Sequence, residues 1–216
     1  MEMITADEFD RLVEFFDRMA QTSWLVAVHD QLKEASGSWE GKDVLDVGCA
    51  TGRILLRGAD EAASITGVDL SPAMVQRAAT IFSELQKKGT FQVADAYDLP
   101  FANDTFDLAI STCVLFLLPD PEIGTREMFR VVKDGGTVMM LNPSTKMNPK
   151  AADQYCQTYQ IKDFEEKAFK QWSKISTSRH RYQEKELTDF LKKLGAKSVS
   201  HTPVLEGLAL VTIAEK

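Results

Sequence analysis

Short apolar runs alternate with amphipathic helical segments through most of this 216-residue chain, and this alternation constrains the fold more than any other feature of the sequence. Several of the helical segments begin with a cap residue followed by proline, as at Ser71-Pro72 and Asp120-Pro121. Strand–helix alternation predicts a parallel sheet with helices on both faces. The first five strands are predicted at residues 43–47, 64–68, 90–94, 106–111 and 137–141.

The last two strand candidates lie at residues 197–204 and 208–214, with too few residues between them for a crossover helix. They are therefore predicted to pair antiparallel. The resulting fold class is α/β: a doubly wound, mostly parallel, seven-stranded sheet of the Rossmann-like type that ends in an antiparallel hairpin. We expect one domain. Its parts are an N-terminal helical lid (1–37), a core (38–143), a helical cap (144–182), and a last helix with the hairpin (183–216).

Composition narrows the range of partners. Lys and Arg number 25 against 32 Asp and Glu, a net charge of -7, which argues against nucleic acid because phosphate binding needs a basic surface. No apolar run approaches the ~20 residues that cross a bilayer, and the acidic N-terminus does not resemble a signal peptide. Cys49, Cys113 and Cys156 are too widely spaced for a disulfide framework or a metal site. We expect a cytoplasmic protein without a metal; the sequence leaves its oligomeric state open.

The segment after the first predicted strand is rich in small residues. Gly48 and Gly52 allow the backbone to turn sharply and to approach a ligand closely. The amide groups that follow suit an anion such as a carboxylate. The spacing is Gly-x-x-x-Gly rather than the Gly-x-Gly-x-x-Gly of dinucleotide-binding proteins. A plain strand-to-helix turn is the alternative interpretation of these glycines.

Acidic residues follow the next two strands. Asp69 can accept hydrogen bonds from both hydroxyls of a ribose, whereas the alternative role of helix cap already suits Ser71. Asp95 can accept a hydrogen bond from an exocyclic amine such as that of adenine, and Ala96 can lie along the ring. Because ligands of doubly wound sheets bind at the carboxyl ends of the strands, the three consecutive strand ends together indicate a cofactor site.

Four segments carry a resemblance to a known family: VLDVGCATGR, VDLSPAMV, ADAYDLPFANDTFD and the stretch from Leu115 through REMFRVVKDGGTVMML. They resemble class I S-adenosylmethionine-dependent methyltransferases of the type that acts on small molecules, over about residues 16–141. The resemblance implies S-adenosyl-L-methionine as the cofactor. It places Asp46, Gly48, Cys49, Ala50 and Gly52 around its methionine part, Asp69 at the ribose, Leu70 and Met74 beside adenine, Asp95 and Ala96 at the adenine amine, and Ser111 and Thr112 near the sulfonium.

The chain departs from the family pattern at two positions. Ala50 stands where glycine is usual, which is a small change if its φ is negative. Phe16 lies on a segment that resembles a helix closing over the cofactor, at a position where relatives often carry a tyrosine. The resemblance therefore includes Phe16 among the cofactor-binding residues but leaves the role of its helix open.

In methyl transfer the main contribution of the protein is to align the two reactants. A general base is required only when the acceptor must lose a proton early, and the sequence identifies no catalytic residue. His29, His180 and His201 have suitable chemistry, although a structural role is favoured for each. The Asn-Pro-Pro-aromatic signature of DNA amine methylation is absent after the fourth predicted strand.

The acceptor is predicted from the segment that interrupts the alternation, residues 144–182. Tyr155 and Tyr159 lie one helical turn apart in it, and we predict that they bind a small, partly apolar acceptor under this cap and the N-terminal helices. Packing of the cap on the domain is the alternative. Two other functions also stay open: an S-adenosylmethionine-binding protein without catalysis, and a nicotinamide-dependent oxidoreductase, which would need the other glycine spacing.

Overall fold

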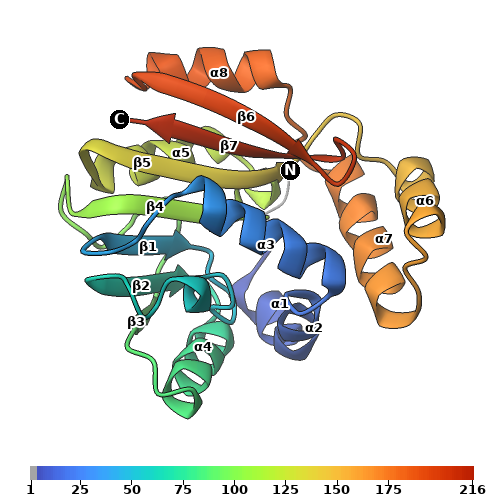
Figure 1. Ribbon diagram of the computed structural model, residues 1–216, viewed down its shortest axis with the longest axis horizontal. Helices are drawn as coiled ribbons and strands as arrows, with labels where there is room; N and C mark the ends of the chain where they lie inside the picture. The colour runs from blue at the N-terminus through green and yellow to red at the C-terminus, as the bar shows by residue number, and fades with distance from the viewer. Residues whose placement is uncertain (1–3) are drawn as a thin grey trace.

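The computed structural model describes residues 4–216. The first three residues of the predicted N-terminal lid lie outside the described residues, and so does that part of the acidic N-terminus. Within that range the strands form one seven-stranded sheet in the order β3-β2-β1-β4-β5-β7-β6 (Figure 1). Neighbouring strands from β3 to β5 pair parallel, and β7 pairs antiparallel with both β5 and β6. The predicted fold class is confirmed.

The strand positions agree with the prediction to within one residue at each end, except in β5. This strand begins at Val132 rather than at 137, because the chain passes directly from helix to strand and the register with its neighbour shifts between Phe106 and Leu108. Gly135 lies in the irregular stretch with a φ of 81°. The strands are β1 (Asp43–Val47), β2 (Ser64–Asp69), β3 (Thr90–Val93), β4 (Phe106–Thr112), β5 (Val132–Pro143), β6 (Ser198–Val204) and β7 (Ala209–Glu215).

Apolar side chains bury both faces of the sheet. Leu108 and Ile110 pack on one face while Ala109 packs on the other, because successive residues of a strand point to opposite sides. The first face is covered by α3 (Ser23–Ala35), and the second by α5 (Pro121–Val131) and α8 (Glu184–Lys193). In residues 4–216 no helix has both the length and the apolar character needed to cross a membrane.

Local signals fix where two of the crossover helices begin. Ser71 accepts a hydrogen bond from the backbone N–H of Met74 at 3.1 Å and precedes α4 (Pro72–Glu84). Asp120 accepts one from the backbone N–H of Glu122 and precedes α5. Both helices carry proline at their first position, so the predicted cap-and-proline starts are confirmed.

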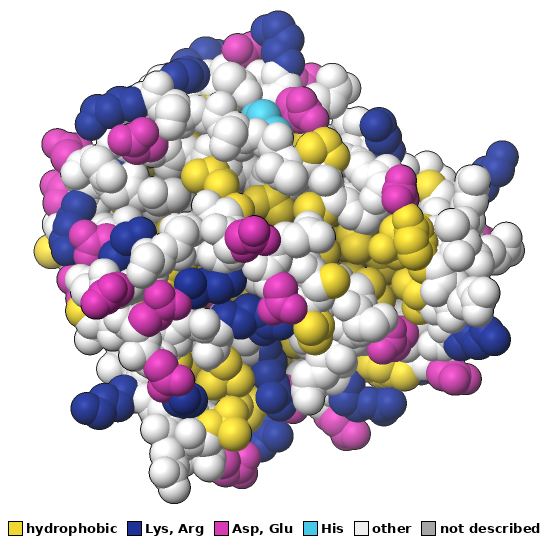
Figure 2. All heavy atoms as spheres, viewed as in Figure 1, with side chains coloured by type: hydrophobic (Ala, Val, Ile, Leu, Met, Phe, Trp, Pro, Cys, Tyr) yellow, Lys and Arg dark blue, Asp and Glu magenta, His cyan; other side chains and the backbone are white. Residues whose placement is uncertain are grey.

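The segment 144–182 is mostly helical, as predicted, and forms α6 (Pro149–Thr158) and α7 (Asp163–Thr177) beside α3 (Figure 1). Trp24 of α3 stacks on Trp172 of α7 with ring centroids 5.6 Å apart, and it meets Phe169 edge-on at 5.0 Å. Hydrophobic side chains also reach the surface in the region of α6 and α7 (Figure 2). Aromatic packing therefore joins this segment to the N-terminal helices.

Candidate cofactor and acceptor site

A cavity lies at the carboxyl ends of β1 to β4, where doubly wound sheets bind ligands. Its wall is formed by the segments that follow these strands and by the N-terminal helices α1 (Ala6–Asp10), α2 (Val13–Met19) and α3. The residues predicted for the cofactor that lie in the wall are Phe16, Gly48, Cys49, Ala50, Asp69, Leu70, Met74, Asp95, Ala96 and Thr112. Asp46, Gly52 and Ser111 are not part of this wall; Ser111 donates a hydrogen bond of 2.9 Å to the carbonyl oxygen of Val47, which is part of it.

The turn after β1 depends on glycine at its first position. Gly48 has a φ of 75°, and a Cβ on it would lie only 2.3 Å from a methyl group of Val114. The backbone N–H groups of Gly48 and Cys49 both donate to the carbonyl oxygen of Val68, at 2.8 and 2.9 Å. The turn is thus held against the end of β2 on one side and against the segment after β4 on the other.

Ala50 has a φ of 44°, so the condition under which alanine would be a small change at this position, a negative φ, is not met. This left-handed conformation is unfavourable for alanine, which explains why glycine suits the position better. The conformation is held by a hydrogen bond of 2.8 Å from the Ala50 backbone N–H to Oδ2 of Asp69. The tie to the neighbouring strand end therefore stabilises a strained turn.

Asp69 links the first two strand ends. One carboxylate oxygen accepts from Ala50, and the other accepts from the backbone N–H of Ser71 at 2.9 Å. Burial raises the pKa of Asp69, although these backbone hydrogen bonds act in the opposite direction. Each carboxylate oxygen has a further lone pair, so the side chain can still accept from ligand hydroxyls.

Asp46 is the most unusual charge near the cavity. It is 0 % exposed, and neither carboxylate oxygen has a hydrogen-bond partner among the described residues. Burial, and next the negative charge of Asp69, raise the pKa of Asp46 to about 8. A buried carboxylate without a partner is unfavourable, so this position suits a ligand that brings a positive charge.

The third strand end is held by its own backbone. Asp95 accepts a hydrogen bond of 2.9 Å from the backbone N–H of Tyr97, and the hydroxyl of Tyr97 accepts one from the backbone N–H of Asp120. Ala94, Asp95 and Ala96 all lie in the cavity wall. This end therefore contributes a carboxylate and two small apolar side chains to the wall.

An ion-pair network that the sequence did not predict joins helix α2 to the turn after β1 and to α4. Asp17 of α2 accepts from Nε and Nη2 of Arg53 at 2.8 and 3.1 Å, from the hydroxyl of Thr51 at 3.0 Å and from Arg77 at 3.4 Å. Burial tends to raise the pKa of Asp17, but the hydrogen bonds and charge of Arg53 outweigh it and lower the pKa. No spacing signal pairs residues so far apart in the sequence.

The three histidines occupy different surroundings. His180 lies 3.2 Å from the carbonyl oxygen of Pro119, and the ring nitrogens of His201 lie 2.7 and 2.8 Å from the hydroxyls of Thr188 and Thr212. Neither of these rings lines the cavity. His29 of α3 does line it and is 3 % exposed.

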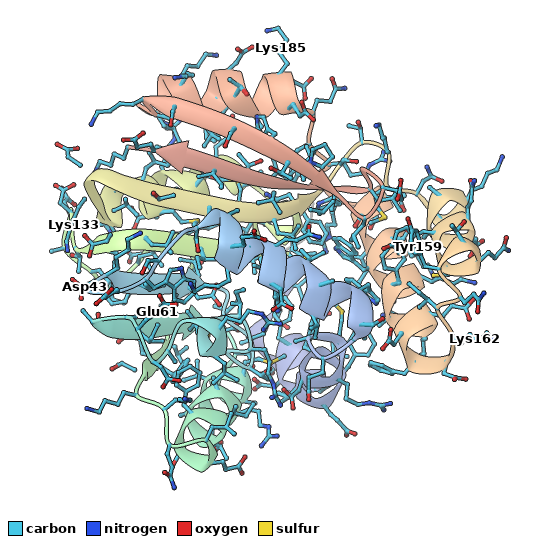
Figure 3. The ribbon with its side chains drawn as sticks, viewed as in Figure 1. Asp43, Glu61, Lys133, Tyr159, Lys162 and Lys185 are labelled. Carbon is cyan, nitrogen blue, oxygen red and sulfur yellow. The ribbon has the colours of Figure 1, made fainter. Side chains whose placement is uncertain are left out.

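The structure does not bring Tyr155 and Tyr159 to the cavity. Tyr155 stacks on Phe169 with centroids 4.9 Å apart, and Tyr159 is 49 % exposed and donates a hydrogen bond to Glu206. Figure 3 shows Tyr159 among α6 and α7, away from α1 and α2. Within residues 4–216 the wall contains no residue of 144–182, because this segment packs against α3 and α3 itself supplies that part of the wall.

Comparison with known proteins agrees with the fold. Residues 39–195 match the family described as methyltransferase domain, and the chain belongs to this family. It is 35% identical over 114 residues to a demethylmenaquinone methyltransferase of Desulfitobacterium hafniense, covering 50% of this chain and 45% of that protein. It is also 35% identical over 104 residues to ajmaline N-methyltransferase of Rauvolfia serpentina, covering 47% and 36%. The chain thus spans less than half the length of these two relatives.

A solved S-adenosylmethionine-dependent methyltransferase from Aquifex aeolicus has a similar fold. Its TM-score is 0.64 at 18% identity, with 86% of this chain and 88% of that chain covered. The family membership supports S-adenosyl-L-methionine as the cofactor, in agreement with the resemblance found in the sequence.

Replacing Ala50 by glycine should stabilise the protein, because glycine adopts a φ of 44° without a Cβ clash. We expect Ala50→Gly to raise the free energy of unfolding by up to about 1 kcal/mol in urea titration. The matched control is Ala79→Gly in the middle of α4, which should lower it by about 1 kcal/mol. A loss of stability in Ala50→Gly would contradict the left-handed conformation.

Removing the carboxylate of Asp17 should loosen the N-terminal helices. We expect Asp17→Ala to speed amide hydrogen exchange in residues 6–35, since the network with Arg53 and Thr51 is lost, while the strands stay protected. Glu14→Ala, which removes an exposed carboxylate from the same helix, is the control. Equal exchange in the two variants would show that the network does not hold these helices.

Proposed function

We propose that this protein is an S-adenosylmethionine-dependent methyltransferase that acts on a small-molecule acceptor by in-line methyl transfer. The observation that carries the proposal is the buried carboxylate of Asp46, which has no partner among the described residues and precedes Val47 and Gly48 in the wall of a cavity at the strand ends. A ligand with an ammonium group and an adenosine part matches that carboxylate and the acidic residues after β2 and β3. When bound, the cofactor supplies a methyl group activated by its sulfonium.

The residues at the strand ends have complementary roles in this proposal. Asp46 pairs with the cofactor's ammonium group, directly or through a bound water, and Gly48 keeps the backbone free of a side chain that would displace Val114. Asp69 accepts hydrogen bonds from the ribose hydroxyls, and Asp95 accepts a hydrogen bond from the adenine amine. The further cofactor-binding residues are Cys49, Ala50 and Gly52 at the methionine part, Leu70, Met74 and Ala96 at adenine, and Ser111, Thr112 and Phe16 near the sulfonium and its cover.

The acceptor side of the cavity favours a small, partly apolar molecule. Phe9 and Leu25 of the N-terminal helices line the cavity, as do Leu117 and Leu118 of the segment after β4, so much of its wall is apolar. The chain's work there is to align the acceptor and to exclude water. Two relatives are named for small molecules, demethylmenaquinone and ajmaline, which supports this acceptor class.

Other features of the chain bear on its partners and location. The net charge of -7 supports an acceptor other than nucleic acid, and free cysteines at positions 49, 113 and 156 support a cytoplasmic location. A role of Tyr155 and Tyr159 in acceptor binding stays a prediction, and their position outside the wall favours the packing role.

Calorimetric titration tests the cofactor. We expect S-adenosylmethionine and S-adenosylhomocysteine to bind in the micromolar range and NAD not to bind. Asp69→Ala should weaken binding by roughly 1.5–3 kcal/mol, the range for hydrogen bonds to a charged group. Tight binding of NAD would overturn the cofactor assignment, and cofactor binding without methyl transfer to any acceptor would favour a binding protein without catalysis.

Cofactor binding should also depend on pH. Asp46 faces Asp69 and Cys49, and its pKa of about 8 means that it must lose a proton before it can pair with an ammonium group. Affinity for S-adenosylhomocysteine should therefore rise from pH 6 to pH 8, approaching tenfold per pH unit. Asp46→Asn should weaken binding at pH 8 and remove most of this rise.

The same pKa has a consequence for stability. Between about pH 4 and pH 8 the folded protein retains a proton on Asp46 that the unfolded chain releases, so stability should fall as the pH rises through this range. Asp46→Asn should flatten this fall and raise the unfolding temperature at pH 8 more than at pH 5. Two results together would show that Asp46 is ionised in the free protein: a wild-type affinity that is independent of pH, and the same pH profile of stability in the wild type and in Asp46→Asn.

A further inference from the structure

The imidazole of His29 is a polar group in the cavity wall that the proposed function leaves unused. It lies on α3, one helical turn after Leu25, which also lines the wall. Its side chain is 3 % exposed, and Nδ1 has no hydrogen-bond partner among the described residues. Buried polar side chains are nearly always partnered in folded proteins, so the ring, which lines the wall, has a hydrogen-bonding capacity that no described residue uses.

The ring is neutral at physiological pH. Burial, and next the positive charge of Arg57, lower the pKa of His29 to about 3. A neutral imidazole offers one hydrogen-bond donor and one acceptor. Arg57 itself is engaged by Asp30 at 2.7 Å and by the carbonyl oxygens of Arg53 and Val26, so it brings no free charge toward the ring.

The position of His29 separates it from the residues proposed for adenosine. Asp69 and Asp95 follow β2 and β3, whereas α3 crosses the face of the sheet in front of β4 and β1 (Figure 1). The wall near α3 includes Met19 and Ala20, and the segment after β4 adds Val114. The basic residue in the wall, Arg53, is already paired with Asp17.

We infer that His29 forms a hydrogen bond with the methyl acceptor, and that the acceptor is an uncharged, mainly apolar molecule carrying a hydroxyl group. This inference rests on the proposed methyltransferase function. A hydroxyl both donates and accepts, so it matches either tautomer of the ring. A carboxylate would be negatively charged at neutral pH and would share the wall with Asp69 and Asp95, while Arg53 is already paired. An aliphatic amine would compete for the carboxylates that the proposed function assigns to the cofactor. With its low pKa, the ring positions the hydroxyl rather than removing its proton.

The test uses protein loaded with S-adenosylhomocysteine and three matched probes: 2-naphthol, 2-methylnaphthalene and 2-naphthoate. In the wild type, 2-naphthol should bind about three- to tenfold more tightly than 2-methylnaphthalene, the range for one neutral hydrogen bond, and 2-naphthoate should bind most weakly. His29→Phe should abolish the preference for 2-naphthol, and His29→Gln should keep part of it. His201→Gln, which changes a histidine outside the cavity, is the control and should keep all of it.

A measurement on the wild type makes the test independent of how well a variant folds. With histidine labelled by nitrogen-15, 2-naphthol should shift the His29 ring resonances of the loaded protein, and 2-methylnaphthalene should not. An unchanged preference in His29→Phe, no shift on adding 2-naphthol, or no binding of 2-naphthol would each overturn the inference. Weaker S-adenosylhomocysteine binding in His29→Phe with the preference intact would assign His29 to the cofactor instead. Failure of the wild type to bind S-adenosylhomocysteine would reject the proposed function itself.

Discussion

The carboxylate of Asp69 joins two strand ends through its hydrogen bonds to the backbone of Ala50 and Ser71. The first bond holds a turn that alanine would otherwise avoid, and the second fixes the residue that caps α4. Parallel pairing of β1 with β2 places these groups at the same edge of the sheet. The segment after β4 packs against this junction, because Val114 lies where a side chain on Gly48 would be.

Three residues around the cavity have surroundings or backbone conformations that lower the stability of the folded protein. Within residues 4–216 the buried carboxylate of Asp46 and Nδ1 of the buried His29 ring have no hydrogen-bond partner, and Ala50 is in a left-handed conformation. Where such groups lie beside a cavity, a bound molecule can supply the partner that the protein lacks. By contrast, Lys133 pairs with both Asp43 and Asp107 at the opposite edge of the sheet, where the charges are satisfied within the chain (Figure 3).

The parts of the fold that the sequence predicts are those with local causes. Strand positions, the caps at Ser71 and Asp120 and the order of elements follow from periodicity and from neighbours within a few residues. The start of β5 depends on a register shift against β4, and the φ of Ala50 depends on a hydrogen bond to another strand. Two contacts join segments that are distant in the sequence: the ion pair of Asp17 with Arg53 and the packing of α7 on Trp24. No local sequence pattern predicts such contacts.

The same long-range contacts couple the cover of the cavity to the cofactor residues. Asp17 of α2 binds Thr51 in the turn after β1, and Asp10 of α1 accepts a hydrogen bond from the hydroxyl of Ser71, whose backbone N–H is held by Asp69. A ligand that changes the position of the turn or of Asp69 therefore changes the ties that hold both helices. Because α3 follows α2 in the chain and carries His29, the same contacts hold both the turn after β1 and the helix that brings His29 to the cavity wall. Such shared contacts are the physical condition for binding at one part of a cavity to alter affinity at another.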